Sequence, residues 1–236
     1  MRVTTAVSPS ELDRLIPPEI AGDTFHHTLE RLAATAGVRT ILDIGASSGE
    51  GSTAALVAGA GRNPDSPVVH CIEVSIPRHA ALERRYRDTG FVHCHNISSI
   101  SLDRFPTEAD VDAFRRRTWT RFRFIRRSLV MGWLRQDIDY IEARGLSGNG
   151  IRDIRDRFGI DRFDLVIIDG SEFTGRAEME DVYGARFIAL DDVRTFKNHD
   201  NRRRLERDSS YRSIAAGRLR NGFAVFERIG SPEARP

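Results

Sequence analysis

The sequence has little of several features that would mark a specialised class of protein. Only two of its 236 residues are cysteines, Cys71 and Cys94, and this is too few for a disulfide scaffold or a cysteine-rich zinc site. Residues 1–18 show no charged-then-apolar leader pattern, and no run of about 18 apolar residues occurs. We therefore expect a cytoplasmic protein that neither is secreted nor spans a membrane.

An excess of charge of one sign is also missing, because 36 basic residues stand against 34 acidic ones. This balance, with 40% hydrophobic residues, excludes a disordered polyelectrolyte and does not favour a nucleic-acid partner. Lysine itself is nearly absent, since 35 of the basic residues are arginines and one, Lys197, is a lysine. A lysine kept where arginine is the rule suggests either a base or a compact charge beside acids.

Short apolar runs separated by glycines and helical stretches predict the fold class. They cover residues 40–44, 68–72, 91–95, 165–168 and 187–190. Their continuous apolar character is typical of strands buried on both faces of a parallel sheet. Near the end, residues 211–214 and 223–226 flank Asn221-Gly222, a sequence that favours an antiparallel hairpin. We predict an α/β fold with a doubly wound, mostly parallel seven-stranded sheet that ends in this hairpin.

The stretch between the third and fourth runs is too long for a simple crossover, which needs about a dozen residues. Apolar residues recur in it at helical spacing from Ile125 to Ile141. We therefore predict an inserted α-helical cap at residues 98–162. The core would comprise residues 1–97 and 163–229, with N-terminal helices at 9–36, and residues 230–236 would form a disordered tail.

A glycine-containing loop follows the first predicted strand and opens a helix. It runs from Asp43 through Gly45, Ala46, Ser47 and Gly49 to Gly51. Glycines let the backbone approach a ligand closely, and free N–H groups at the start of a helix favour polar ligand atoms. Glu73 ends the second strand, where a carboxylate can accept both hydroxyls of a ribose. The loop and Glu73 together predict a nucleoside-containing cofactor.

One family that this loop resembles is the short-chain dehydrogenases, which bind NAD(P) and carry a G-x-x-x-G-x-G loop. That resemblance implies a Tyr-x-x-x-Lys pair for proton transfer. The residues four positions after Tyr86, Tyr140, Tyr183 and Tyr211 are not lysines, so the pair is absent. The loop alone keeps an NAD(P)-dependent oxidoreductase as an alternative.

The loop also resembles the D-x-G-x-G-x-G motif of class I S-adenosylmethionine-dependent methyltransferases, with Ser47 in place of the middle glycine. Asp43, Gly45 and Gly49 match that motif, and Glu73, Asn96 and the pair Asp169-Gly170 stand at the ends of the second, third and fourth strands, as is typical of that family. The resemblance implies that the loop cradles the methionine part of the cofactor and that Glu73 holds its ribose. It further implies that Asn96 and Ile97 contact adenine and that Asp169 borders the cofactor.

Carboxylates follow the fourth and fifth predicted strands, namely Asp169 and the pair Asp191 and Asp192. If these strands are parallel neighbours, the three acids share one edge of the sheet, where oxygen ligands suit Mg²⁺ or Mn²⁺. This resembles the catechol O-methyltransferase arrangement, in which a metal grips the substrate hydroxyls. Glu172 stands where those enzymes can carry a lysine base. The resemblance implies catalytic roles for Asp169 and Glu172, and we add Lys197 as a third candidate.

Seven arginines crowd the insertion between Arg115 and Arg127, interleaved with Trp119 and two phenylalanines. They indicate either a clamp for phosphate or carboxylate groups or a solvated helix with packed arginine stems. We expect methyl transfer from S-adenosylmethionine to a small polar acceptor, with a hydroxyl as the methylated group and an anionic acceptor among the possibilities. A catalytically silent cofactor-binding module and a homo-oligomer are left open.

Overall fold

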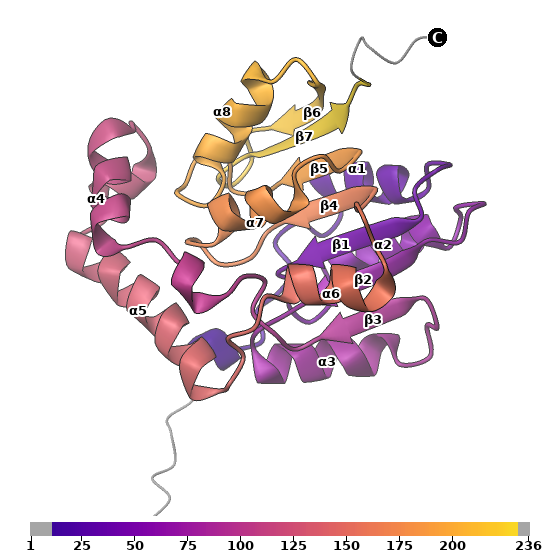
Figure 1. The fold of residues 1–236 in the computed structure, drawn as a ribbon, viewed down its shortest axis with the longest axis horizontal. Helices are drawn as coiled ribbons and strands as arrows, with labels where there is room; N and C mark the ends of the chain where they lie inside the picture. The colour runs from indigo at the N-terminus through magenta and orange to yellow at the C-terminus, as the bar shows by residue number, and fades with distance from the viewer. Residues whose placement is uncertain (1–10, 231–236) are drawn as a thin grey trace, which may run out of the picture.

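A computed structural model of the chain describes residues 11–230, and the predicted α/β sheet is confirmed (Figure 1). Seven strands form one sheet in the order β3-β2-β1-β4-β5-β7-β6. Strand β7 runs antiparallel to both β5 and β6, so the predicted closing hairpin is present. The strands are β1 (Thr40–Ile44), β2 (Val68–Ile72), β3 (Val92–His95), β4 (Leu165–Ile168), β5 (Phe187–Leu190), β6 (Tyr211–Gly217) and β7 (Phe223–Arg228).

The central strands end at the same level of the sheet. Ile44 at the end of β1 is in register with Ile72 of β2 and with Ile168 of β4. Ile168 in turn pairs with Leu190 of β5. The loops that follow these four strands therefore leave the sheet side by side, and this is the edge at which ligands bind in open parallel sheets.

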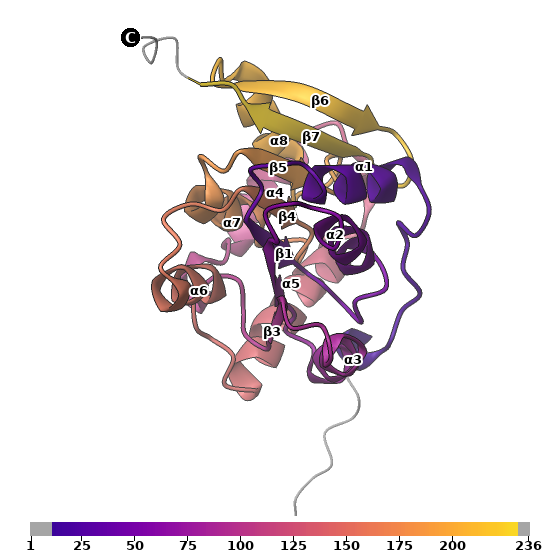
Figure 2. The ribbon, with the colours of Figure 1, turned by 90° about the vertical axis from the view of Figure 1, so that its right-hand side faces the viewer.

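Helices cover both faces of the sheet (Figure 2). On one face, α1 (Thr24–Ala33), α2 (Ser52–Ala60) and α3 (Ile76–Tyr86) bury a cluster that includes Ile41 of β1. On the other face lie α6 (Gly150–Phe158), α7 (Gly175–Val182) and α8 (His199–Arg207), with residues in a cluster that includes Leu42. Neighbouring strand residues thus pack into opposite layers, which explains the continuous apolar runs of the sequence.

The insertion folds into helices, as predicted. It contains η2 (Leu102–Arg104), α4 (Glu108–Arg117), η3 (Arg121–Phe124) and α5 (Arg127–Ala143). A capping box between Thr107 and Asp110 starts α4. Helix α6 packs against α7 on the face of the sheet, in the place of the crossover helix. The inserted helices share one buried cluster with that face, and the boundaries of a separate cap stay a prediction.

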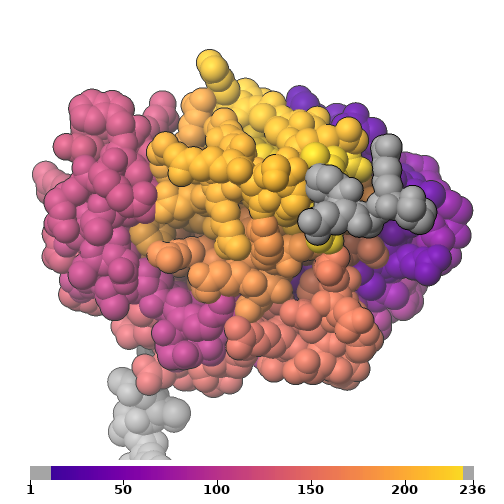
Figure 3. Space-filling view, turned by 45° about the horizontal axis from the view of Figure 1, so that its top comes forward, coloured from indigo at the N-terminus to yellow at the C-terminus, as the bar shows by residue number. Residues whose placement is uncertain are grey.

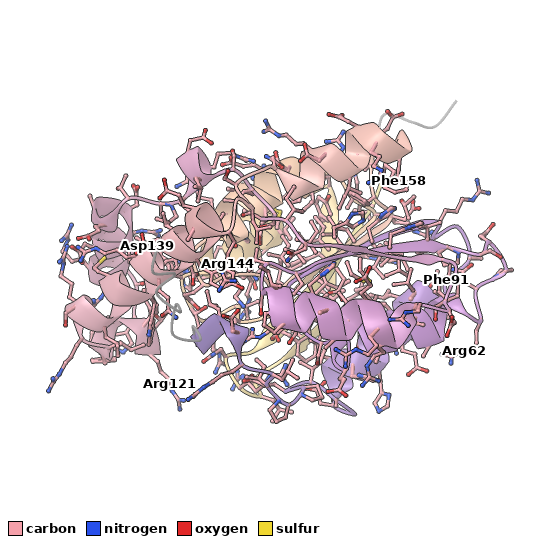
Figure 4. The ribbon with its side chains drawn as sticks, turned by 90° about the horizontal axis from the view of Figure 1, so that it is seen from below. Arg62, Phe91, Arg121, Asp139, Arg144 and Phe158 are labelled. Atoms are coloured by element: carbon pink, nitrogen blue, oxygen red, sulfur yellow. The ribbon has the colours of Figure 1, made fainter. Side chains whose placement is uncertain are left out.

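Helix α5 crosses the carboxyl edge of the sheet. The Tyr140 hydroxyl accepts a hydrogen bond from the backbone N–H of Ile76, at 3.1 Å, and donates one to Asp13, at 2.6 Å. Figure 4 shows Asp139 and Arg144 of α5 on one side of the molecule and Phe91 and Phe158 on the other. Helix α5 is therefore fixed over the loops that follow the strands.

The N-terminal segment begins with η1 (Glu11–Asp13), where the sequence predicts a longer helix from residue 9. Residues 9–10, and residues 231–236 of the tail predicted at 230–236, lie outside the described residues. Among the helices at residues 11–230, none combines the length and the apolar character that crossing a bilayer requires.

Candidate functional site

A cavity of about 320 Å³ lies at the carboxyl ends of β1, β2, β4 and β5. Its walls come from the loops after these strands, from α5 and from the segment that precedes α1. The predicted site residues that line it are Gly45, Ala46, Ser47, Glu73, Asp169, Asp191, Asp192 and Lys197. The structure thus brings together most of the residues singled out in the sequence.

The glycine loop adopts the conformation that its sequence predicts. Gly45 and Gly49 have φ values of +87° and +80°. A Cβ atom on Gly45 would lie 2.1 Å from the carbonyl oxygen of Asp169, so only glycine allows the backbone after β1 to approach the backbone after β4 this closely. Ser47, which replaces the middle glycine of the motif, also has a positive φ of 50°. Its buried Oγ has no hydrogen-bond partner among residues 11–230, which is rare for a buried hydroxyl.

Glu73 is held by backbone N–H groups on both carboxylate oxygens. The N–H of Ser47 donates to Oε2 at 2.8 Å, and the N–H of Ser75 donates to Oε1 at 2.7 Å. Burial raises the pKa of this carboxyl, and the two N–H groups act against that rise. Each oxygen keeps a lone pair for a further donor. Glu73 is therefore a fixed acceptor on the wall of the cavity, as recognition of two neighbouring hydroxyls requires.

Other predicted cofactor residues lie behind the wall rather than on it. Asp43 is fully buried and accepts hydrogen bonds from Ser52 and Thr53 at the start of α2. Asn96 donates to the carbonyl oxygens of Glu73 and Val74, at 2.8 and 3.0 Å. These contacts tie the loop to α2 and fix the end of β2.

Gly49 and Ile97 are also absent from the wall of the cavity. The Tyr86 hydroxyl donates to the carbonyl oxygen of Gly49 at 2.6 Å, which anchors the glycine loop to α3. Ile97 packs against the backbone at Gly148 and Gly150, where an added Cβ would lie 2.7 Å from its side chain. The adenine contacts expected of Asn96 and Ile97 stay a prediction.

Lys197 places its ammonium group between two of the predicted carboxylates. Its Nζ donates to Asp169 at 2.8 Å and to Asp192 at 2.9 Å, and the side chain is only 7% exposed. Burial opposes the charge, but the carboxylates of Asp169 and Asp192 outweigh it and raise the pKa of Lys197 well above its usual value. The single lysine of the chain is therefore a protonated, compact charge beside acids, the second of the two roles suggested by the sequence.

The loop that carries Lys197 is fixed from both sides. Glu172 accepts hydrogen bonds from the backbone N–H groups of Phe196 and Lys197, at 2.6 and 3.2 Å. The buried Asn198 amide donates to the carbonyl oxygens of Ile168 and Asp191. Glu172 does not line the cavity, so its position favours support of Lys197 over direct contact with a substrate.

The third predicted metal ligand, Asp191, turns to another cation. It lies 3.3 Å from Arg220, and its Oδ1 accepts the N–H of Asp192. A divalent ion held by Asp169 and Asp192 would need the place that the ammonium of Lys197 fills, and two buried cations in one space repel each other. Among the described residues, no group of three or more His, Cys, Asp or Glu side chains could hold a metal ion. The residues present therefore do not fit the predicted Mg²⁺ or Mn²⁺ site.

One acid of the cavity, Asp137 of α5, is not among the residues singled out from the sequence. Burial raises its pKa to about 6, and the Ser171 hydroxyl after β4 donates a hydrogen bond to it. No cation within the described part of the chain forms an ion pair with it, which distinguishes it from Asp169, Asp191 and Asp192. Asp137 lies three residues after Leu134 and four before Ile141, which places it on the apolar face of α5. An acid on the apolar face of a helix is the feature of the sequence that could have identified it.

Comparisons with known proteins bear on the fold. No family model and no curated protein matches the chain. Its structure is similar to that of an O-methyltransferase from Bacillus cereus in complex with SAH, with a TM-score of 0.54, 15% identity and coverage of 91% of this chain and 84% of that one. It is also similar to a candidate O-methyltransferase from Klebsiella pneumoniae, with a TM-score of 0.53, 11% identity and coverage of 97% and 93%.

A third similar structure is cofactor-bound Rv0187 from MTB, with a TM-score of 0.51, 15% identity and coverage of 92% of this chain and 85% of that chain. The protein thus has the class I S-adenosylmethionine-dependent methyltransferase fold, as the resemblance predicted. Strand β7, which is antiparallel and lies between β5 and β6, distinguishes the sheet from the dinucleotide-binding order 3-2-1-4-5-6.

Proposed function

We propose that the protein transfers a methyl group from S-adenosylmethionine to an oxygen atom of a small polar acceptor. The observation that carries this proposal is one cavity lined both by the Ser47 hydroxyl and Glu73 and by Lys197 and Asp137. The first two residues fit a cofactor with hydroxyl and amino groups. The second two fit an acceptor oxygen that must lose a proton.

The cofactor would be held by groups that are already in place. Glu73 would accept the ribose hydroxyls, and the unpartnered Ser47 Oγ would pair with the polar end of the methionine part. The residues therefore fit the group. When bound, S-adenosylmethionine supplies an electrophilic methyl group on a sulfonium sulfur.

Lys197 would orient the acceptor. An ammonium group has three donors, and Asp169 and Asp192 take two of them. The third is left for an acceptor oxygen, whose growing negative charge it would stabilise before the oxygen attacks the methyl carbon. Asp137 would take the proton of the acceptor hydroxyl, because it lines the cavity on α5 and burial raises its pKa to about 6, close to the pH at which a base must work.

The same ammonium would take the part that the sequence assigned to a divalent ion. Both a metal and an ammonium can hold an oxyanion by charge, and this chain carries the charge on Lys197.

Free Cys71 and Cys94 also fit the reducing cytoplasmic setting that we propose.

Thermal unfolding with added ligand tests the cofactor assignment. A ligand that binds only the native state raises stability, by about 2.7 kcal/mol at a hundred times its Kd. We expect S-adenosylhomocysteine to raise the midpoint and NADP to leave it unchanged. Stabilisation by NADP alone would reverse the assignment in favour of an oxidoreductase. A panel of catechols, phenols and hydroxy acids, followed by the release of S-adenosylhomocysteine, then tests transfer to oxygen.

A further inference from the structure

A second cavity, a groove of about 570 Å³, lies outside the proposed active site and shares no lining residue with it. It runs between the insertion, at Trp119 to Arg121, and the segment around α8 and the final hairpin. Figure 3 shows the surface of the insertion directly beside that of the C-terminal segment. The groove is lined by six arginines, namely Arg121, Arg194, Arg202, Arg203, Arg218 and Arg220. Glu206 is the one acid among the described residues that line it.

Most of this positive charge is uncompensated. Arg202 pairs with Glu206, and Arg220 pairs with Asp23 and Asp191. The other four form no ion pair with any carboxylate at residues 11–230, and they are Arg121, Arg194, Arg203 and Arg218. Like charges gathered on one wall repel each other, so the groove favours an anion that several guanidinium groups can share.

The arginine run of the insertion, which stands out in the sequence, contributes only one arginine to this groove. Arg115 donates to backbone carbonyl oxygens, and Arg127 pairs with Glu108 and Asp112. These contacts hold the insertion together. Of that run, Arg121 lines the groove, and Figure 4 shows it at the periphery of the insertion.

The two walls of the groove are fixed to each other. Arg117 of α4 forms an ion pair with Asp200 of α8. Phe114 packs edge-on against His199, with ring centroids 5.5 Å apart. The separation of the two backbones that carry the arginines is therefore set by the fold, so the groove does not have to be assembled when an anion binds.

An aromatic ring stands at one end of the groove. The Trp119 side chain is 79% exposed. A large apolar ring that is this exposed indicates a binding surface. Arg123 lies 5.0 Å from the centre of its ring, and Phe124 packs against it edge-on. These contacts hold the indole in place beside the arginines, where a planar group could stack on it.

We infer that this groove binds a small phosphate ester that carries a planar ring, of the nucleotide class. Guanidinium groups match phosphate oxygens in pairs, and the indole offers a stacking surface for a base. The finite volume of the groove favours a single nucleotide over a nucleic-acid strand. Arg220 and Asn221 line the groove and also contact Asp191 and Asp192, so its ligand would lie one layer of residues from the proposed active site.

Calorimetric titration of the full chain with ADP tests the inference. We expect one ADP site whose affinity falls as salt is added, because salt screens the exposed charges. The double variant Arg203→Glu with Arg218→Glu should lower the affinity by about a hundredfold, since each charge-assisted hydrogen bond is worth roughly tenfold in affinity and two are removed. Arg84→Glu, which reverses an exposed arginine of α3 at the opposite edge of the sheet, is the matched control and should leave ADP binding unchanged.

Two further measurements distinguish ADP bound in this groove from ADP bound in the proposed active site. ADP should bind equally well when S-adenosylhomocysteine is saturating, and Trp119→Ala should weaken ADP but not pyrophosphate. The inference is wrong if wild-type protein does not bind ADP at low salt, if S-adenosylhomocysteine displaces ADP, or if the groove variant and the control bind alike. Tighter binding of a single-stranded oligonucleotide through the same arginines would also overturn it, in favour of a nucleic-acid surface.

Discussion

Replacing Lys197 by alanine should convert an ion pair of the protein into a metal site. The substitution removes the ammonium that lies 2.8 Å from Asp169 and 2.9 Å from Asp192 and leaves both carboxylates in the same buried space. Removing one partner of a buried ion pair costs about 3–5 kcal/mol. A domain with an unfolding free energy of about 5–15 kcal/mol has room for this loss, so we expect a folded but weakened variant.

A divalent cation should then restore much of what the substitution removes. Mn²⁺ at a hundred times its Kd would add about 2.7 kcal/mol to the stability of Lys197→Ala. Urea unfolding with and without Mn²⁺ measures this gain, and electron paramagnetic resonance of Mn²⁺ counts the ions bound. Wild-type protein should show neither effect. The double variant Lys197→Ala with Asp192→Asn is the control and should lose the gain.

Tight binding of one Mn²⁺ by wild-type protein would refute this reasoning. It would show that the ammonium and a metal do not compete for the same carboxylates. The measurement on wild type decides the question even if Lys197→Ala fails to fold. Activity that survives exhaustive chelation would agree with the ammonium as the cation of the site.

Two further predictions concern single carboxylates. Burial raises the pKa of Asp137 to about 6. If Asp137 takes the acceptor proton, kcat should rise with pH through about 6, because only the ionised carboxylate can accept a proton. Asp137→Asn should abolish that rise and lower kcat by about 10²–10⁴. Burial raises the pKa of Asp43 from 3.8 to about 6, so the folded state binds the carboxyl proton more tightly than the unfolded state does. The stability that this bound proton contributes is therefore lost as pH rises from about 4 to 6. The loss amounts to about 3 kcal/mol at 1.36 kcal/mol per pH unit. Urea unfolding of wild type and Asp43→Asn across this range measures it, and identical pH slopes would contradict it.

The strands could be predicted closely because their signal is local. Four of the five parallel runs match the observed strands, and β3 begins at Val92 rather than at residue 91. Burial of both faces requires apolar residues throughout, and each strand therefore has a clear start and end in the sequence. The glycine loop and Glu73 were equally accessible, because their positions follow from the ends of the first two strands.

The pairing inside the site could not be predicted from local patterns. The sequence placed Asp169, Asp191 and Asp192 at one edge, but it does not determine which cation each of them meets. That depends on the loop of Lys197, which Asn198 and Glu172 fix through long-range contacts. Asp137 was missed because it comes from the insertion, and only the tertiary fold brings α5 over the edge of the sheet.

Binding of S-adenosylmethionine through Glu73 underlies the proposed function, and calorimetry with S-adenosylhomocysteine measures it without any need for an acceptor. We predict one site per chain in the wild-type protein. Glu73→Ala should weaken it by about ten- to a hundredfold, since hydrogen bonds to a charged group are worth roughly 1.5–3 kcal/mol. Circular dichroism should show that the variant is folded. Unchanged affinity in the folded variant, or no binding by wild type, would contradict the account.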